Sequence, residues 1–498
     1  MKTFLKSFSV VTFFALLTRC ISFLFKIYLS RTLGAEILGL YQISLSVFML
    51  LSSFSTTGIP LAISRITAQE SITNNNKKIF AYLTSALVLA FVLSALPCAF
   101  MLIFPNALNF FFQDTRCSKI LLVMMPLFFT VSIYAIIRNY FCGKKDFNIF
   151  SITELLDEIL KIIVAIILFS TSCFFMIDKL YTYALAMVIG DVLLIIVIII
   201  IYIKKKGRFA PPIYFNEIIK YSAPISLQRI IATLLSSFIS ITLPFELVNQ
   251  CGLSVSESTA EFGRATAMVM SLIMAPNAIL GSLNIILIPD IAELSYKHSN
   301  SILSQKISKT ILLTTFIASL FLSIFLGLGN ELGEYLYKDN KVGEYLTIAA
   351  FIVIPQSINF YLISILNTTK NENKSFYTYA FSSLFLIAII FITPKYLNIY
   401  SYFCALFVFH LVSALLNGYI LNKQIPFSLT SLKLSIYIIL YSIICGITAK
   451  YISNKLNIHI LLKLLILGLF ELILHAIPLL IYSCIKNKQP MQKILLHK

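Results

Sequence analysis

Cationic side chains inside long apolar stretches are the residues of this chain best suited to chemistry. Arg19 and Lys26 lie in the first such stretch, two helical turns apart, and would project from one face of a helix. A cation at the centre of a bilayer costs about 2.5 to 3.5 kcal/mol. We therefore expect this face to line a wet cavity. The alternative is that Lys26 extends to the nearer headgroups.

Two further stretches carry a guanidinium group. Arg229 begins a stripe of Ser and Thr at helical spacing with Gln228 beside it, and Arg264 lies in the Pro-containing stretch 262-288. We predict that Arg229 faces Arg19 across a central cleft, an arrangement that suits a phosphate-bearing ligand. Hydrogen bonds between helices are the alternative explanation for the Ser and Thr residues.

Carboxyl groups gather in two other apolar stretches. Glu154, Asp157 and Glu158 share one helical face with Lys161, and Asp191 lies in the next stretch. A buried carboxylate can exchange protons near neutral pH, so these residues are candidates for a counter-charge or a cation-coupling site. The alternative for the Glu154 group is a solvated start of a helix.

The composition indicates which elements position these charges. The 498 residues are 59% hydrophobic and 12% charged, and apolar stretches of about 20 residues recur along the chain, each long enough to span a bilayer as a helix. This predicts an all-α polytopic membrane protein. The net charge of +18 would suggest nucleic acid as the partner of a soluble protein, but here the lysines lie in short breaks between spans, so we exclude it.

We predict about fourteen transmembrane helices. Most Lys and Arg between the spans lie in the N-terminal tail and in alternate loops, which places both termini in the cytoplasm and the protein in the cytoplasmic membrane. The alternative is twelve or thirteen helices with one re-entrant segment. The predicted spans are 8-29, 38-63, 79-103, 120-141, 150-171, 181-203, 217-243, 262-288, 307-328, 345-366, 376-393, 399-421, 433-450 and 460-484.

An internal repeat supports this count. Ile59-Pro60 recurs as Ile288-Pro289 and Pro126 recurs as Pro355, both at an offset of 229 residues, which predicts two six-helix halves in the same orientation. The predicted regions are an N-terminal lobe (1-206), a basic cytoplasmic linker (207-216), a C-terminal lobe (217-423), and two additional transmembrane helices with a cytoplasmic tail (424-498).

No motif of an enzyme or of a cofactor site is found. The chain has no phosphate-binding loop, no H-E-x-x-H and no G-x-S-x-G. The nine cysteines are scattered without a C-x-x-C pair, and the five histidines are isolated in sequence. We therefore predict no catalytic residue, no cofactor and no metal site, and we interpret the basic and apolar N-terminus as an uncleaved first helix.

Three segments resemble a known family. They are LSRTLGAE (29-36), LGLYQ (38-42) and GIPLAISR (58-65). These resemble the polysaccharide-transporter branch of the multidrug/oligosaccharidyl-lipid/polysaccharide (MOP) exporter superfamily, of the stage V sporulation protein B type, which is related to the lipid II flippases. The resemblance implies two six-helix lobes in a V, alternating access, contact of Arg19 with a diphosphate, and a groove for a lipid tail at the last two helices. The chain departs from the flippases at Ser52-Ser53, where they carry a basic pair.

The expected function is that of a flippase for an undecaprenyl-diphosphate-linked saccharide or peptidoglycan precursor, which serves the spore cortex or another envelope polysaccharide. Membrane lipids and envelope polymer synthases are candidate partners. The alternatives are a cation-coupled multidrug efflux transporter of the same superfamily and a membrane glycosyltransferase or polymerase. An efflux pump for cations would have carboxylates and aromatic residues in its cavity, and a polymerase would need larger outer loops.

Overall fold

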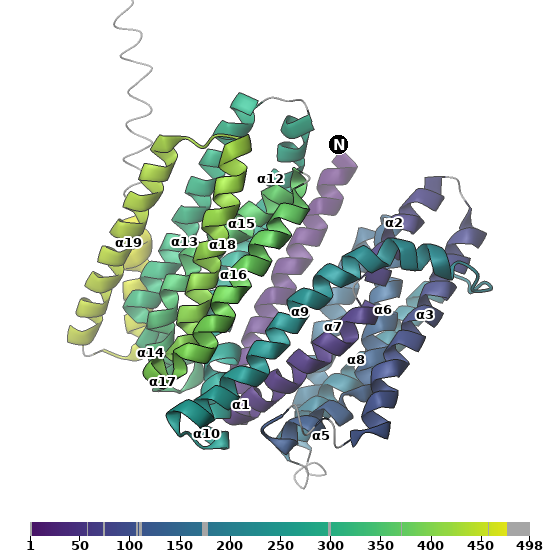
Figure 1. The fold of residues 1–498 in the computed structure, drawn as a ribbon, viewed down its shortest axis with the longest axis horizontal. Coiled ribbons are helices and arrows are strands. Elements are labelled where there is room, and N and C mark those ends of the chain that lie inside the picture. The colour runs from purple at the N-terminus through teal and green to yellow at the C-terminus, as the bar shows by residue number, and fades with distance from the viewer. Residues whose placement is uncertain are drawn as a thin grey trace, which may run out of the picture. The chain divides into compact units, whose positions relative to one another are not determined.

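The protein is described by a computed structural model that covers residues 2-56, 58-72, 75-105, 108, 112-171, 178-296, 300-369, 371-456 and 458-475. Every regular element in these residues is helical (Figure 1). Contacts between residues divide the chain into two compact units, Met1–Ala267 and Met268–Lys498. The predicted lobes place 217-267 with the second half instead, and this assignment stays a prediction.

The first unit contains helices that contact one another through apolar faces and small residues. Their bounds are α1 (Lys2–Thr56), α2 (Gly58–Ile72), α3 (Asn76–Ile103), α5 (Thr115–Val123), α6 (Met125–Gly143), α7 (Phe147–Ser170), α8 (Lys179–Lys204), α9 (Phe215–Cys251) and α10 (Val255–Gly263).

Helix α1 contains two successive segments joined at Gly34. The backbone there has φ 81° and ψ 172°, a region that is open almost only to glycine. Directly after this break, Glu36 Oε1 accepts a hydrogen bond from Arg116 of α5 at 2.6 Å, and the two side chains form an ion pair. The break therefore separates the segment that carries Arg19 and Lys26 from the segment that packs on α9, where Ser237 Oγ donates to the carbonyl of Ser46.

The second unit begins within a π-helical turn, η2 (Arg264–Val269). In Figure 1 its long helices α13, α15, α16, α18 and α19 run side by side. The elements are α11 (Met270–Ile273), α12 (Ala275–Tyr296), α13 (Asn300–Tyr337), α14 (Asn340–Ala349), η3 (Ala350–Ile352), α15 (Val353–Thr368), α16 (Glu372–Ile392), α17 (Pro394–Leu397), α18 (Tyr400–Gln424), α19 (Leu429–Lys455) and a last helix over 460-475.

Similar local structure occurs around Pro126 and Pro355, the two prolines of the predicted repeat, which itself stays a prediction. The helix before Pro126 breaks at Met124, and the helix before Pro355 breaks at η3. Both broken helices begin with an aspartate cap, Asp114 and Asp339, whose carboxylate accepts the backbone N–H two residues later. One hydrophobic core joins α2, α3, α6, α8 and the start of α9 at Ile218, while the other joins α12, α13, α15 and α18.

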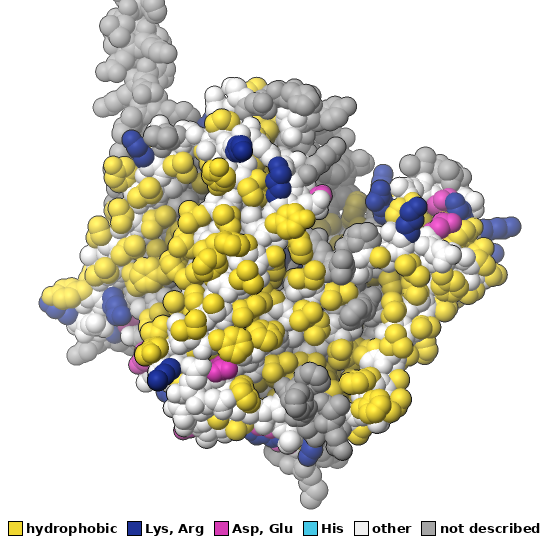
Figure 2. Space-filling model, in the orientation of Figure 1, with side chains coloured by type: hydrophobic (Ala, Val, Ile, Leu, Met, Phe, Trp, Pro, Cys, Tyr) yellow, Lys and Arg dark blue, Asp and Glu magenta, His cyan; other side chains and the backbone are white. Residues whose placement is uncertain are grey.

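Helices cover all fourteen predicted spans as far as the described residues extend. Within those residues, 11 helical segments are long and apolar enough to cross a membrane. One of them, Val11–Ser53, contains two predicted spans, while the charged helix α7 and the last helix are not counted. On the face drawn in Figure 2, hydrophobic side chains cover the middle of the helices, and Lys and Arg lie mostly near their ends. This confirms the predicted all-α polytopic membrane fold.

Candidate functional site: charged groups of the first unit

Lys161 lies between two carboxylates in the interior of the first unit. Its ammonium group is 2.7 Å from Asp157 of the same helix, α7, and 2.8 Å from Asp191 of α8. The Asp191 side chain is only 7% exposed, and that of Lys161 is 22% exposed. Two of the four predicted counter-charge residues are thus brought together on one cation. The shared helical face predicted that Asp157 lies near Lys161, but the sequence did not predict that Asp191 of the next span contacts the same ammonium group.

Close approach of α7 and α8 makes this contact possible. Gly190 immediately precedes Asp191, and a Cβ atom there would lie 2.8 Å from Cγ and 3.0 Å from Cα of Lys161. Any larger residue would separate the two backbones. The small residue therefore allows the short Asp191 side chain to reach the ammonium group.

A second ion pair joins α6 to α7. Arg138 contacts Glu154 at 2.6 Å, donates from Nε to the carbonyl of Phe150, and lies 3.8 Å from the centre of the Phe150 ring. Sequence reasoning identified Glu154 but missed Arg138. The sequence did contain a signal for Arg138. It is a guanidinium group in an apolar stretch, and only a short loop separates that stretch from the acidic face of the next helix. Glu158 is half-buried and makes no ion pair within the described residues.

The predicted substrate-binding cations have a different environment. Arg19, Lys26 and Arg229 are exposed, and within the described residues none of their side chains makes a hydrogen bond or an ion pair. Arg19 and Lys26 lie in the segment Val11–Ser53, and Arg229 begins the segment Arg229–Cys251, both long and apolar enough to cross a membrane. Such unneutralised cations require water, headgroups or an anionic ligand beside them.

The other two predicted binding residues differ from these three. Arg264 is half-buried in the π-helical turn and contacts Glu261 at 3.3 Å, so part of its charge is already balanced. The Gln228 side chain lies outside the described residues. The predicted placement of Arg19 and Arg229 across a cleft stays a prediction.

The second unit has an apolar groove of about 750 Å³. It is lined by residues of α13, α15, α18 and α19, among them Leu322, Leu362, Leu415 and Ile436. Leu415 is 64% exposed and Ile436 is 58% exposed, so the groove opens at the surface of the unit. The resemblance predicted a groove at the last two helices, and α19 is the one of them that lines this groove.

The fold and the charges define a multi-pass helical membrane protein with ionisable groups inside its spanning segments. The sequence profile of the family described as "Polysaccharide biosynthesis protein" matches residues 4–295. The chain belongs to this family, as the resemblance predicted.

Individual relatives agree with this assignment. Stage V sporulation protein B of Bacillus subtilis (strain 168) is 23% identical over 474 residues, which are 92% of this chain and 90% of that protein. The solved structure of lipid II flippase MurJ in an inward closed conformation has a TM-score of 0.74, with 15% identity over 97% of this chain and 99% of that chain. An inward-facing multidrug resistance MATE family transporter of the MOP superfamily has a TM-score of 0.68, with 14% identity over 82% and 94%. The chain therefore shares its fold with lipid II flippase MurJ and with this MATE family transporter.

Proposed function

We propose that the protein is a flippase that carries an undecaprenyl-diphosphate-linked saccharide or peptidoglycan precursor from the inner to the outer leaflet of the cytoplasmic membrane. The observation that carries this proposal is the contrast among charges of the spanning helices. Arg19, Lys26 and Arg229 are exposed without a partner in the described part of the chain, whereas Asp157 and Asp191 form ion pairs with Lys161. These three exposed side chains offer cationic groups to a ligand, and a diphosphate is a matching anion.

The apolar groove of the second unit suits a lipid tail. Its lining is almost entirely aliphatic and aromatic, and it opens at the surface of the second unit. A polyprenyl chain could lie there and remain in contact with lipid, so its desolvation is not required. The diphosphate would meanwhile be held by the cations of α1 and α9, with Arg264 as a further contact. The similarity to lipid II flippase MurJ supports a cargo of this kind.

Energy coupling is assigned to the carboxylates. Asp157 and Asp191 share one ammonium group, and Glu158 adds a third carboxyl group on the same helix face. This leaves more carboxylates than cations around Lys161, so the group can take up a proton or a metal cation during transport. We further propose that both termini are cytoplasmic and that the product serves the spore cortex or another envelope polysaccharide.

The proposal is tested by reconstitution in liposomes with a fluorescent undecaprenyl-diphosphate-linked saccharide and an impermeant quencher. A guanidinium-to-phosphate hydrogen bond is worth about 1.5 to 3 kcal/mol, so Arg19→Ala and Arg229→Ala should each slow transfer about tenfold or more. The matched control is Arg208→Ala, since Arg208 is also exposed but lies between the predicted spans. Equal transfer by all three variants and the wild type would remove the cations from the mechanism.

The alternative of cation-coupled drug efflux predicts a different result in the same liposomes. Organic cations such as ethidium would then be transported, and transport would depend on Asp191 rather than on Arg19. The fold similarity to a MATE family transporter is the observation that keeps this alternative in the experiment.

A further inference from the structure

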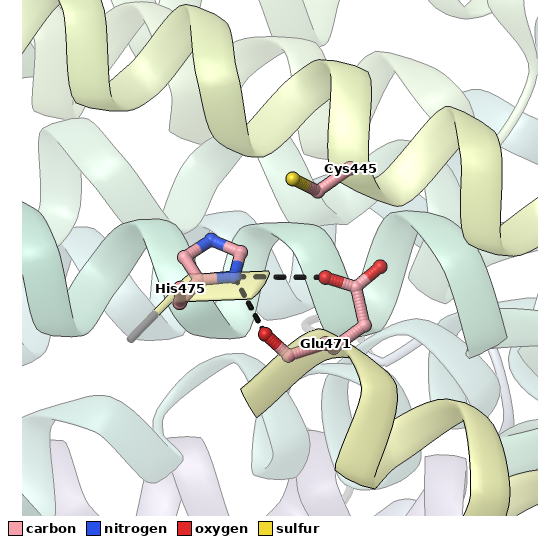
Figure 3. Close-up of side chains that lie close together, drawn as sticks. All are labelled: Cys445, Glu471 and His475. Carbon is pink, nitrogen blue, oxygen red and sulfur yellow. Dashed lines mark hydrogen bonds and ion pairs between the residues drawn. The ribbon is translucent and has the colours of Figure 1, made fainter. Parts of the chain in front are cut away.

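Three side chains with metal-binding atoms meet in the interior of the second unit. Cys445 belongs to α19, and Glu471 and His475 belong to the last helix, as Figure 3 shows. One atom from each, the sulfur, a carboxylate oxygen and a ring nitrogen, lies within 4.8 Å of the other two. All three residues are buried, with 3%, 0% and 2% of their surface exposed. The isolated positions in the sequence concealed this cluster, because the two helices bring it together.

His475 is oriented in the way that metal-binding histidines are. Its Nδ1 lies 2.9 Å from the backbone carbonyl of Glu471, one turn earlier. This hydrogen bond requires the proton on Nδ1, so Nε2 carries a free lone pair. Nε2 is buried and has no hydrogen-bond partner within the described residues. Ligating histidines typically donate their other ring N–H to a carbonyl or carboxylate in this manner.

Glu471 is also incompletely satisfied. Its Oε2 accepts a hydrogen bond from Ser323 of α13, while Oε1 is buried without a hydrogen-bond partner among the described residues. A buried carboxylate with an unpaired oxygen is costly, and a bound cation would remove that cost. The ring nitrogen that faces the carboxylate is Nδ1, 3.6 Å from Glu471 Oε2. The orphaned atoms, Glu471 Oε1 and His475 Nε2, belong to the same two side chains of the cluster and are the second observation that points to a ligand.

The donor set identifies the class of cation. A thiolate excludes Mg²⁺ and Ca²⁺ as good occupants, because these prefer oxygen ligands. Sulfur, imidazole nitrogen and carboxylate oxygen together are ligands of Zn²⁺. Binding would displace the proton of the Cys445 thiol, and one thiolate and one carboxylate would neutralise Zn²⁺ inside an apolar helix bundle.

We propose that Cys445, Glu471 and His475 form a Zn²⁺ site that ties α19 to the last helix. Tetrahedral Zn²⁺ holds its ligand atoms about 3.5 Å apart, so the cluster closes with small side-chain rotations. The Ser323 hydroxyl group or a water molecule completes the coordination. Tyr441 donates to the Leu474 carbonyl at 2.9 Å, which fixes the neighbouring turns of the two helices. The site stabilises the C-terminal helix pair and is independent of the proposed transport activity.

The test uses the full-length protein purified in detergent, stripped with a chelator and dialysed against ZnCl₂, with bound zinc measured by mass spectrometry. We expect about one Zn²⁺ per chain in the wild type. Affinity should fall at least about tenfold in Cys445→Ser and in His475→Gln. The matched controls are Cys404→Ser and His410→Gln, a cysteine and a histidine of α18, which should bind zinc like the wild type.

A second measurement keeps the proposal testable if the variants do not fold. Co²⁺ replaces Zn²⁺ in the wild-type protein, and a cysteine ligand then gives a thiolate-to-cobalt charge-transfer band in the near ultraviolet. The band should be present in the wild type and in Cys404→Ser. Absence of the band in the wild type, or equal zinc binding by Cys445→Ser and the wild type, would overturn the site.

Discussion

Arg138 of α6 and Lys161 of α7 form ion pairs with carboxylates of α7 and α8. By contrast, Arg19 and Lys26 of α1 and Arg229 of α9 have no ion-pair partner within the described residues. Both sets lie in the first unit and in apolar segments of the sequence. The first set has Lys161 at 2.7 and 2.8 Å from two carboxylates and Arg138 at 2.6 Å from a third. A charge that is paired inside a bundle contributes to stability, and a charge that is left open is available to a ligand. Mutations should therefore separate the two sets by what they damage.

The largest expected effect on stability is that of Lys161→Met. It leaves Asp157 and Asp191 close together without their cation, and breaking a buried pair costs about 3 to 5 kcal/mol. The free energy of unfolding, measured by titration with SDS in mixed micelles, should fall by this amount. Lys205→Met, which removes an exposed partner of Asp146, should cost less than about 1 kcal/mol. Combining Lys161→Met with Asp157→Asn and Asp191→Asn should restore most of the loss; if it does not, packing rather than charge holds α7 to α8.

Gly190→Ala should have the next largest effect. Its new methyl group would meet the Lys161 backbone, and such overpacking costs about 1 to 3 kcal/mol. The control is Gly468→Ala, where no atom of the described residues lies within 4 Å of the new Cβ and helix propensity favours alanine. The same SDS titration should show destabilisation only for Gly190→Ala. Equal behaviour of the two variants would mean that α7 and α8 are not in close contact at Asp191.

Arg138→Gln is expected to cost about 1 kcal/mol, because its ion pair is partly exposed and its stacking on Phe150 is a modest interaction. A double-mutant cycle with Glu154→Gln isolates the ion pair. A coupling energy near zero would assign the loss to the Phe150 contact alone.

The smallest effect on stability is expected for Arg19→Ala and Arg229→Ala. Neither side chain has a partner to lose within the described residues, so the free energy of unfolding should change by less than about 0.5 kcal/mol. Transfer of the lipid-linked saccharide should nevertheless fall about tenfold or more. A large loss of stability in either variant would show that the cation is a structural group, and the comparison of the two sets would fail.

The sequence predicted most of the fold because membrane spans are defined by local composition. The apolar stretches, the repeat of Pro126 at Pro355 and the charged face of α7 required no knowledge of distant contacts. Finding the ion-pair partner of each charged side chain did require knowledge of contacts between distant residues. Arg138 pairs with Glu154 across a turn, and Cys445 meets Glu471 and His475 only because α19 packs on the last helix. The groove expected at the last two helices came from the resemblance alone and stays a prediction, since hydrophobic lining residues do not differ in type from residues that face lipid.

Gly34 has a consequence for the direction of the first spanning segment. Its backbone at φ 81° and ψ 172° is accessible almost only to glycine, and among the described residues no atom lies within 4 Å of a Cβ placed there. A substitution at Gly34 would thus be destabilised by torsional strain and not by steric overlap. The chain would relieve that strain by changing the direction of the part of α1 that precedes Gly34. The two backbone torsions of Gly34 therefore set the direction of the helical segment that carries Arg19 and Lys26.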